Sequence, residues 1–511
     1  MTGTSKSIEQ VLHIKPTISS EMINAIELWG DMYQNKAPWL KDGTPENPER
    51  VTSLGIPAFI ASEKARMCTL EMKSEITPVM EATEATEPNT GLNIEQEAPT
   101  GDTARADFLN EQYKKTIFKD IRTQLEYGIA KGGLVIKPYI VNSNVEGEQA
   151  AEIAMDYIQA DGFYPIAFNA SGKITEAAFV QKIIDKENTY SRLEYHKLEG
   201  STVTVINKAY KSYNSGSQSL QSNELGSEVP LSSIPEWASL EPETKITNVD
   251  SLLFAYFKPP IANTVDTYSP LGVSAYSRAV NLIRDADEQY SRILWEYEGS
   301  ELAIDIDRDA LTLERDKDGR DITVHSKKQN RLYRKVDMND ESTYNVFSPQ
   351  IRDTSLFNGL NNILMRIEDT CELARGTIAD VNVEARTATE ITVLKQRSYA
   401  ANAQMQLQLE NTLKDVIHIM DVYTSLYELA PEGEYNVSFE WDDSIKVDKE
   451  SEMNKRLTLV NAGIDSKVSF RMWYFGETEE QALQALAKNQ AYNNYEAQNA
   501  MENQMIANGE E

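Results

Sequence analysis

Cysteine and histidine are scarce in this chain, and basic residues are far outnumbered by acidic ones. The 511 residues include two cysteines, four histidines, 50 basic and 80 acidic residues, for a formal net charge of −30. So acidic a chain is poorly suited to gripping a phosphate backbone, because that affinity comes from lysine and arginine displacing counterions. It is equally unsuited to anionic membrane surfaces. Cys68 and Cys371 lie far apart in helix-like patterns, so we expect free buried thiols in a reducing cytosol rather than a disulfide.

Long hydrophobic runs and targeting signals are also missing. No run reaches the roughly 18 apolar residues that a transmembrane helix needs. The first sixteen residues, MTGTSKSIEQVLHIKP, lack the apolar core and small-residue cleavage site of a secretory signal. The composition is otherwise that of a globular protein, with 41% hydrophobic and 25% charged residues. We therefore expect no membrane association, and the length predicts about three or four domains or subdomains.

The motifs of the common enzyme classes are absent as well. The sequence contains no HExxH or HxH, no GxGxxG after a strand, no GxxxxGK[ST] and no GxSxG. Asp305, Asp307 and Asp309 imitate the start of a calcium loop. However, Ala310 stands where that loop needs glycine, and Asp316 stands where it needs glutamate. We therefore interpret the aspartates as solvated carboxylates at a strand end and expect no enzymatic activity, no cofactor and no metal.

The first half of the chain shows helical periodicity and then strand periodicity. Residues 20–77 are predicted to be mostly helical, including a helix over 56–76, and a further helix is predicted over 107–131, ending at Gly132-Gly133. Two polar stretches, 81–106 and 212–233, are interpreted as mobile surface loops. Turn residues separate a series of short β-rich runs that predict an antiparallel meander. These runs are 134–141, 163–168, 177–184, 190–198 and 202–210.

Two amphipathic helices bracket a compact segment in the middle of the chain. The segment 301–352 has nearly balanced charge, with 10 basic and 11 acidic residues. The helices are predicted over 271–300 and 354–376, so they form an antiparallel hairpin that carries an inserted module. The first helix has an apolar stripe at Tyr276, Val280, Ile283, Tyr290, Leu294 and Tyr297. The second has one at Leu356, Leu360, Ile363, Ile367 and Cys371.

The longest predicted helix begins at 387 and runs to about Leu429. Thr387 and Glu390 have the S/T-x-x-E spacing of a capping box. Heptad positions in the second half are apolar, so we expect a neighbouring subunit to cover part of this helix. They are Leu409, Leu413, Val416, Met420, Tyr423 and Tyr427. A strand over 435–443 follows, and then helices over 448–462, 467–475 and 478–490, the last with a second capping box at Thr478 and Gln481.

Six segments, in this order along the chain, resemble the portal proteins (head–tail connectors) of tailed bacteriophages. They are 61–72, 127–140, 158–180, 254–287, 376–399 and 460–488. The more specific pieces are the TATE capping box at 387–390 and the block that begins PPIAN at 259 and ends SPLG at 272. The predicted loops at 81–106 and 212–233 depart from the family pattern.

The resemblance implies a mixed α+β portal fold. In chain order it implies a wing of helices and antiparallel sheet (1–268), a first stem helix (269–300), a clip (301–352), a second stem helix (353–375), a tunnel loop (376–386), a long helix with a returning wing strand (387–445), and C-terminal crown helices with a tail (446–511). The departures from the pattern leave the outer rim of the wing unassigned.

The resemblance also implies a function. Portal subunits form a ring, usually of twelve, at one capsid vertex, and double-stranded DNA passes through it without sequence specificity during packaging and ejection. The ring docks the terminase motor and then head–tail adaptors, and it contacts the major capsid and scaffolding proteins. These properties imply a virion component that assembles in the cytoplasm of a bacterial host.

Site residues follow from the resemblance by position. The tunnel loop, expected nearest to DNA, includes Gly376, Thr377, Asp380, Asn382, Glu384 and Arg386, and is followed by the Thr387 and Glu390 cap. Clip arginines are expected to bind other subunits or partners, although solvated surface charge is an equal interpretation. They are Arg308, Arg315, Arg320, Arg331 and Arg334.

Two alternatives stay open at this stage. One is another oligomeric acidic virion protein, scaffold-like or capsid-associated. A scaffold is expected to be mostly coiled coil and to lack a sheet over 134–210. The other is an enzyme of a class without these motifs, which turnover by the purified protein would reveal.

Overall fold

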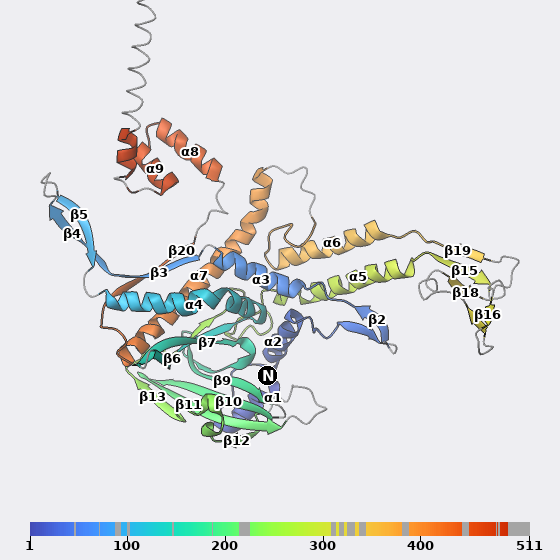
Figure 1. Ribbon diagram of the computed structural model, residues 1–511, viewed down its shortest axis with the longest axis horizontal. Helices are drawn as coiled ribbons and strands as arrows, with labels where there is room; N and C mark the ends of the chain where they lie inside the picture. The colour runs from blue at the N-terminus through green and yellow to red at the C-terminus, as the bar shows by residue number, and fades with distance from the viewer. Residues whose placement is uncertain are drawn as a thin grey trace, which may run out of the picture. The chain divides into compact units, whose positions relative to one another are not determined.

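The computed structural model forms two compact units, Met1–Phe439 and Glu440–Glu511, and each is described by itself. It describes residues 1–44, 47–70, 72–86, 93–99, 103–145, 148–185, 188–213, 225–307, 313–315, 321–323, 333–336, 344–380, 388–441, 449–476, 478 and 481–488. In the described part of the chain, helices combine with sheets whose strands pair antiparallel, apart from one short parallel pair of 304–307 with 333–336 (Figure 1). None of the described helices has the length and apolar character needed to cross a membrane.

The predicted meander is present in part: four of its five runs lie in one six-stranded sheet, and the run 134–141 belongs to a different sheet. Four long strands pair consecutively and antiparallel, and two short strands, β12 (Ser227–Val229) and β13 (Glu243–Thr247), pair with the last of them. The long strands are β8 (Phe163–Phe168), β9 (Ile174–Asp185), β10 (Asn188–Glu199) and β11 (Thr202–Tyr213). The turns between them use Gly172 and Gly200, which have φ of 78° and 62°. Glycine adopts this left-handed backbone without strain.

A second sheet contains a strand that sequence periodicity missed. Its order is β14 (Ala255–Phe257), β6 (Leu134–Val145) and β7 (Glu148–Gln159). The β7 sequence, EQAAEIAMDYIQ, is rich in residues that favour helices. It is a strand because every residue of it pairs with β6, and such tertiary pairing overrides local propensity.

Helices pack on this smaller sheet and on one another. α4 (Ala104–Lys131) packs on β6 and β7, and α7 (Ala388–Leu426) packs on β6 and β14. The remaining helices of this region are α1 (Thr2–Leu12), α2 (Ser20–Tyr33) and α3 (Ile56–Thr69), with short 3₁₀ turns at Ala160–Gly162, Leu231–Ser233 and Pro235–Trp237. As predicted, α4 ends at the glycine pair: Gly132 has φ of 88°, and its N–H donates to the Gly128 carbonyl at 2.8 Å.

Much of the second half of α7 is buried within its own chain, but Leu407 is 58% and Leu426 48% exposed, so the neighbouring subunit expected on part of this helix stays a prediction. Its heptad residues Leu409, Leu413, Val416 and Met420 are fully buried in a single copy. Arg105, at the start of α4, is also buried. It binds the side chain and carbonyl of Asp421, the Ser425 hydroxyl and the Ala430 carbonyl, so it ties the first turn of α4 to the end of α7.

Two predictions for the region 56–106 were wrong. The helix over 56–76 ends at Thr69, and Met72 belongs to β3 (Met72–Pro78), whose alternate residues are buried against the core. β3 pairs with β20 (Tyr435–Trp441), a strand that the alternating sequence did predict. The expected loop at 81–106 contains the hairpin β4 (Met80–Thr86) and β5 (Asn93–Pro99) and the first turn of α4. A shorter hairpin, β1 (Lys41–Thr44) with β2 (Asn47–Val51), lies earlier in the chain.

The bracketed arrangement in the middle of the chain is also present. α5 (Val280–Gly299) and α6 (Asp353–Thr370) pack side by side, and short strands occupy the chain between them (Figure 1). β15 (Ala303–Asp307) lies between β18 (Tyr333–Val336) and β19 (Tyr344–Phe347), and β16 (Leu313–Arg315) pairs with β17 (Asp321–Thr323).

The start and the buried face of α5 differ from the prediction. The helix begins at Val280, after a 3₁₀ turn at Ser277–Ala279, rather than at 271. Ile283 is buried as expected, but Tyr297 is 38% exposed. Asp287 is buried instead, because its carboxylate accepts hydrogen bonds from the Trp39 indole at 3.0 Å and the Leu54 amide at 2.8 Å. A buried acid with such partners cannot be distinguished from a solvated one by periodicity.

The second unit contains the predicted helices, α8 (Lys449–Asn461), α9 (Lys467–Phe475) and a helix over 481–488. The capping box at Thr478 and Gln481 is confirmed in both directions. The Gln481 amide donates to the Thr478 hydroxyl at 3.4 Å, and the Thr478 amide donates to the Gln481 carbonyl oxygen at 3.2 Å.

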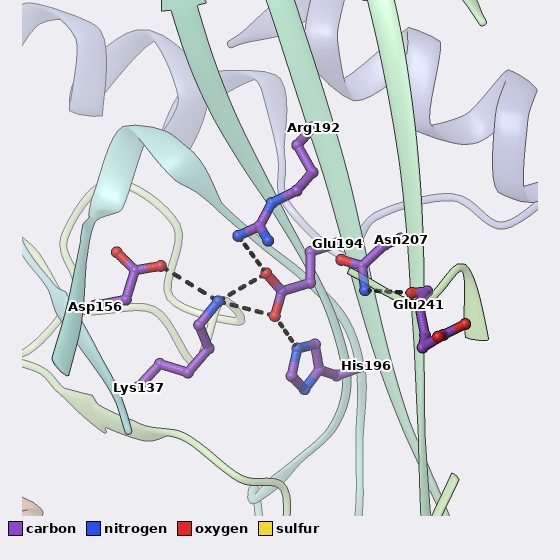
Figure 2. Close-up of polar contacts among 7 residues, drawn as sticks. All are labelled: Lys137, Asp156, Arg192, Glu194, His196, Asn207 and Glu241. Atoms are coloured by element: carbon purple, nitrogen blue, oxygen red, sulfur yellow. Dashed lines mark hydrogen bonds and ion pairs between the residues drawn. The ribbon is translucent and has the colours of Figure 1, made fainter. Parts of the chain in front are cut away.

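A buried cluster of charges joins the two sheets of the first unit (Figure 2). Glu194 of β10 binds Lys137 of β6 at 2.7 Å, Arg192 at 2.8 Å and the His196 Nε2 at 2.6 Å; Lys137 also lies 3.3 Å from Asp156 of β7. Burial alone raises the pKa of Glu194, but Lys137, His196 and Arg192 together hold that pKa well below its usual value. Glu194 therefore stays ionised and links β10 to the neighbouring sheet.

We expect Glu194→Gln to destabilise the chain by about 3–5 kcal/mol at pH 7, because it leaves the buried Lys137 and the partly buried Arg192 without this carboxylate. Since the folded pKa of Glu194 is depressed, its stabilising contribution is present above the unfolded pKa of about 4.3 and is lost as pH falls through the folded value. Urea denaturation across pH measures the free energy of unfolding of wild type and variant. The difference between the two free energies should become smaller in acid. Glu199→Gln, an exposed position on the same strand, is the control and should change little. Equal losses in both variants would contradict the assignment.

Candidate functional site at the turn after α6

The chain reverses direction immediately after α6. The Cys371 amide still donates to the Ile367 carbonyl at 2.9 Å, and then Glu372 adopts a left-handed backbone with φ of 57°. Gly376 has φ of 89°, which glycine accommodates without strain. The segment 376–380, which begins the expected tunnel loop, therefore leaves the helix through a tight turn rather than a flexible linker.

The buried carboxylate of Glu368 holds this turn. Its Oε1 accepts hydrogen bonds from the amides of Ile378 at 2.6 Å and Ala379 at 2.8 Å, and its Oε2 accepts one from Gly376 at 3.2 Å. The side chain is inaccessible to solvent, and no lysine or arginine in the described part of the chain pairs with it. Three backbone donors thus satisfy the charge, and hydrogen bonds to an ionised acceptor are among the strongest in proteins.

Asn361 extends the anchor two helical turns back along α6. Its Oδ1 accepts from the Asp380 amide at 2.8 Å, and its Nδ2 donates to the Asp380 carbonyl at 2.8 Å. Within the turn itself, the Thr377 hydroxyl donates to the Ala374 carbonyl at 2.6 Å. Residues 376–380 therefore run back along α6, over about 10 Å at 1.5 Å per residue, with their backbone fixed at both ends.

The base of the turn packs against α3 and α7. Lys64 of α3 is buried beside it; burial lowers the pKa of Lys64, while Cys371 and Glu372 oppose that shift. The Asn402 amide of α7 donates to the Met67 carbonyl at 3.0 Å and joins the two helices. Both thiols of the chain are free and buried, as predicted, and burial raises the pKa of Cys68 and of Cys371 to about 12.

Only part of the predicted tunnel loop is placed. Gly376, Thr377 and Asp380 belong to the anchored segment, and Asp380 is exposed where that segment ends. Asn382, Glu384, Arg386 and the capping residue Thr387 lie outside the described residues. Glu390 lies in α7, but its side chain is likewise outside them.

For two of the five predicted clip arginines the structure gives the backbone register, and the other three lie outside the described residues. Arg334 of β18 is the register partner of Asp305 in β15, and Arg315 of β16 is the register partner of Asp321 in β17. The pairing thus sets each arginine beside an aspartate of its own chain. Arg308, Arg320 and Arg331 lie outside the described residues.

Glu368 and Asn361 were not predicted as site residues. The available signal was their position: each directly follows a residue of the apolar face of α6, Ile367 and Leu360, so each borders that face. Nothing in the sequence identifies backbone amides ten residues later as the partners of an acid.

Hydrogen bonds to Glu368 and Asn361 fix a backbone, and neither residue adjoins a nucleophile or an acid–base pair. Among the residues that the structure describes, no group of three or more histidine, cysteine, aspartate or glutamate side chains is arranged to hold a metal ion. The site therefore serves to position the residues that follow Asp380.

Comparisons with known proteins identify related chains. The family model "Phage portal protein, SPP1 Gp6-like" matches residues 12–496. Among solved structures, a chain of the "Neck of native GTA particle computed with C12 symmetry" is similar over 82% of this chain and 89% of that chain. Its sequence identity is 9% and the TM-score is 0.34. A comparison with curated proteins finds no match.

We expect Glu368→Gln to loosen the turn, because the amides of Gly376, Ile378 and Ala379 lose a charged acceptor. A loss of about 1–3 kcal/mol corresponds to amide exchange that is roughly ten- to hundredfold faster at these positions, which hydrogen-exchange mass spectrometry measures. Asp353→Asn, at the exposed first turn of the same helix, removes the same charge and is the control. Unchanged exchange over 376–380 in Glu368→Gln would contradict the anchoring role.

Proposed function

Because the chain belongs to the SPP1 Gp6-like family of phage portal proteins, we propose that it forms the ring-shaped portal at one capsid vertex and conducts double-stranded DNA during packaging and ejection. Membership makes it a structural component of a phage-like particle. The observation that carries the conduit role is the anchored turn: a chain segment fixed at its base by Glu368 and Asn361 can project into a channel without collapsing onto the protein.

Exposed apolar side chains on α5 and α6 support a ring. Trp295 is 69% exposed, Phe357 44% and Tyr297 38% in a single copy, so both helices of the pair carry large exposed apolar side chains. In a head-to-tail ring every copy presents two different surfaces, so the α5–α6 pair of each copy has a neighbour on both sides. We propose twelve copies, the usual number in the family.

The acidic character of the chain suits a conduit. DNA carries about one charge per 1.7 Å of its axis, so a basic wall accumulates phosphate contacts and holds the duplex. Charges more than about 8 Å away are screened at physiological salt, and only wall residues matter. We propose that residues 376–386, with Asp380 and Glu384 against Arg386, are the part of the protein nearest to DNA.

The other parts of the chain receive roles in the same proposal. The segment 301–352 forms the clip, which docks the terminase motor and afterwards head–tail adaptors, and its arginines contact neighbours or these partners. The sheets and helices of 1–268 form the wing, which meets the capsid and scaffolding proteins, and 446–511 forms the crown. Assembly takes place in the bacterial host cytoplasm. A scaffold-like alternative is disfavoured, because the six-stranded sheet of β8–β13 is foreign to a coiled-coil protein.

Trp295→Ser tests the ring. We expect the variant to keep its fold, since the side chain is largely exposed, and to assemble at a protein concentration about tenfold higher than wild type, because a buried aromatic contact is lost from each interface. Particle imaging and sedimentation measure assembly. Tyr268→Ser, at a 97% exposed tyrosine outside the helix pair, is the control. A wild-type chain that stays monomeric at all concentrations would refute the ring itself.

Charge reversal at the wall tests the conduit. We expect Asp380→Lys combined with Glu384→Lys to slow packaging by about tenfold at low salt, because the added cations bind phosphates, and to recover as salt is raised. Nuclease-protected DNA in a packaging reaction measures the rate. Glu199→Lys with Glu243→Lys changes the net charge equally in the wing sheet and should package normally. A packaging rate that is normal at every salt concentration would contradict the proposal that residues 376–386 line the channel.

A further inference from the structure

The middle of α4 exposes a basic surface in this acidic chain. The residues that compose it, called here the α4 basic patch, are Lys114, Lys115, Phe118, Lys119 and Arg122. At 100° per residue they share one face of the helix. Phe118, near the middle of that face, is 46% exposed. An aromatic ring bordered by cations on a chain of net charge −30 is an unusual surface and indicates an acidic partner.

Half of the cations in the patch are available for such a partner. Lys114 lies 3.3 Å from Glu75, and Lys115 lies 3.0 Å from Glu152. Lys119 and Arg122 form no ion pair with any residue in the part of the chain that the structure describes, and the exposed acid between them, Asp120, pairs with neither.

The hairpin of β4 and β5 has the complementary character. Residues 80–99 contain five glutamates and no lysine or arginine. The register places Glu84 directly opposite Glu95, and like charges at opposed positions destabilise a strand pair. In the described structure each strand pairs only with the other, and a lone two-stranded hairpin is marginally stable. The hairpin therefore gains stability from a basic surface that covers it.

We propose that the β4–β5 hairpin of one copy docks on the α4 basic patch of the next copy in the ring. The proposal rests on the ring assembly proposed above. A head-to-tail ring supplies a second copy to every hairpin. Each strand of seven residues spans about 23 Å, enough to cross onto an adjoining subunit. Glutamates of the hairpin pair with Lys119 and Arg122 around Phe118.

Three charge-reversed chains test this docking. The hairpin-reversed chain carries Glu84→Lys and Glu95→Lys. The patch-reversed chain carries Lys119→Glu and Arg122→Glu, and the third chain carries all four changes. Each of the first two should need about tenfold more protein for half-assembly, because two attractive pairs become repulsive at every interface. A mixture of these two chains should assemble like wild type, because the hairpin of each chain is then opposite in charge to the α4 basic patch position of the other. The chain with all four changes should also assemble normally. Sedimentation at graded protein and salt concentrations gives the midpoints.

The outcomes separate docking from its alternatives. Rescue by the four-fold chain but not by the mixture would mean that the hairpin docks on its own α4, and the proposal fails. Normal assembly of both single-reversal chains would mean that the patch serves DNA or another virion protein, and the proposal again fails, while the ring stands. The control, Lys36→Glu with Lys245→Glu, makes the same change in net charge as the patch-reversed chain at two exposed sites and should assemble normally. Failure of wild type to form rings would refute the proposed function instead.

Discussion

A buried carboxylate is tolerated in a protein only where donors surround it, and the organisation of this chain depends on that requirement in two places. Glu194 is surrounded by side chains and joins two sheets that share no strand. Glu368 is surrounded by backbone amides and fixes the start of the segment proposed to face DNA. The contacts of Glu194 hold these two sheets together. The contacts of Glu368 fix the backbone just after α6, so the chain beyond Asp380 starts from a fixed position.

This division suits the conduit role proposed for the chain. A passive channel needs a wall that keeps its position under load and that does not bind what passes. Position comes from the hydrogen bonds of Glu368 and Asn361 and from the packing of α7 within its own subunit. Weak binding comes from a surplus of acidic residues. The exposed cations on α4 are proposed to serve contacts between copies rather than contacts with DNA.

Much of the fold was accessible from the sequence because it is local. The meander over 163–210, the end of α4 at Gly132 and the capping box of Thr478 and Gln481 each depend on neighbouring residues. The failures depend on distant partners. β7 has helix-favouring residues and is a strand only because β6 pairs with it, and Met72 continued a helical spacing but belongs to β3. At the site, family resemblance predicted the tunnel segment. Glu368 and Asn361 could be identified only from the structure, because their partners are backbone amides that no sequence pattern marks.

The two free thiols bear on the life of the assembled particle. Cys68 and Cys371 are buried, and a thiol pKa of about 12 leaves almost no thiolate at neutral pH. Thiolate is the form that oxidants and disulfides attack. A protein assembled in a reducing cell can therefore persist in aerated surroundings without covalent cross-links between neighbours or ageing at these sulfurs, and a maleimide dye added to a cysteine engineered on its surface would report on that position alone.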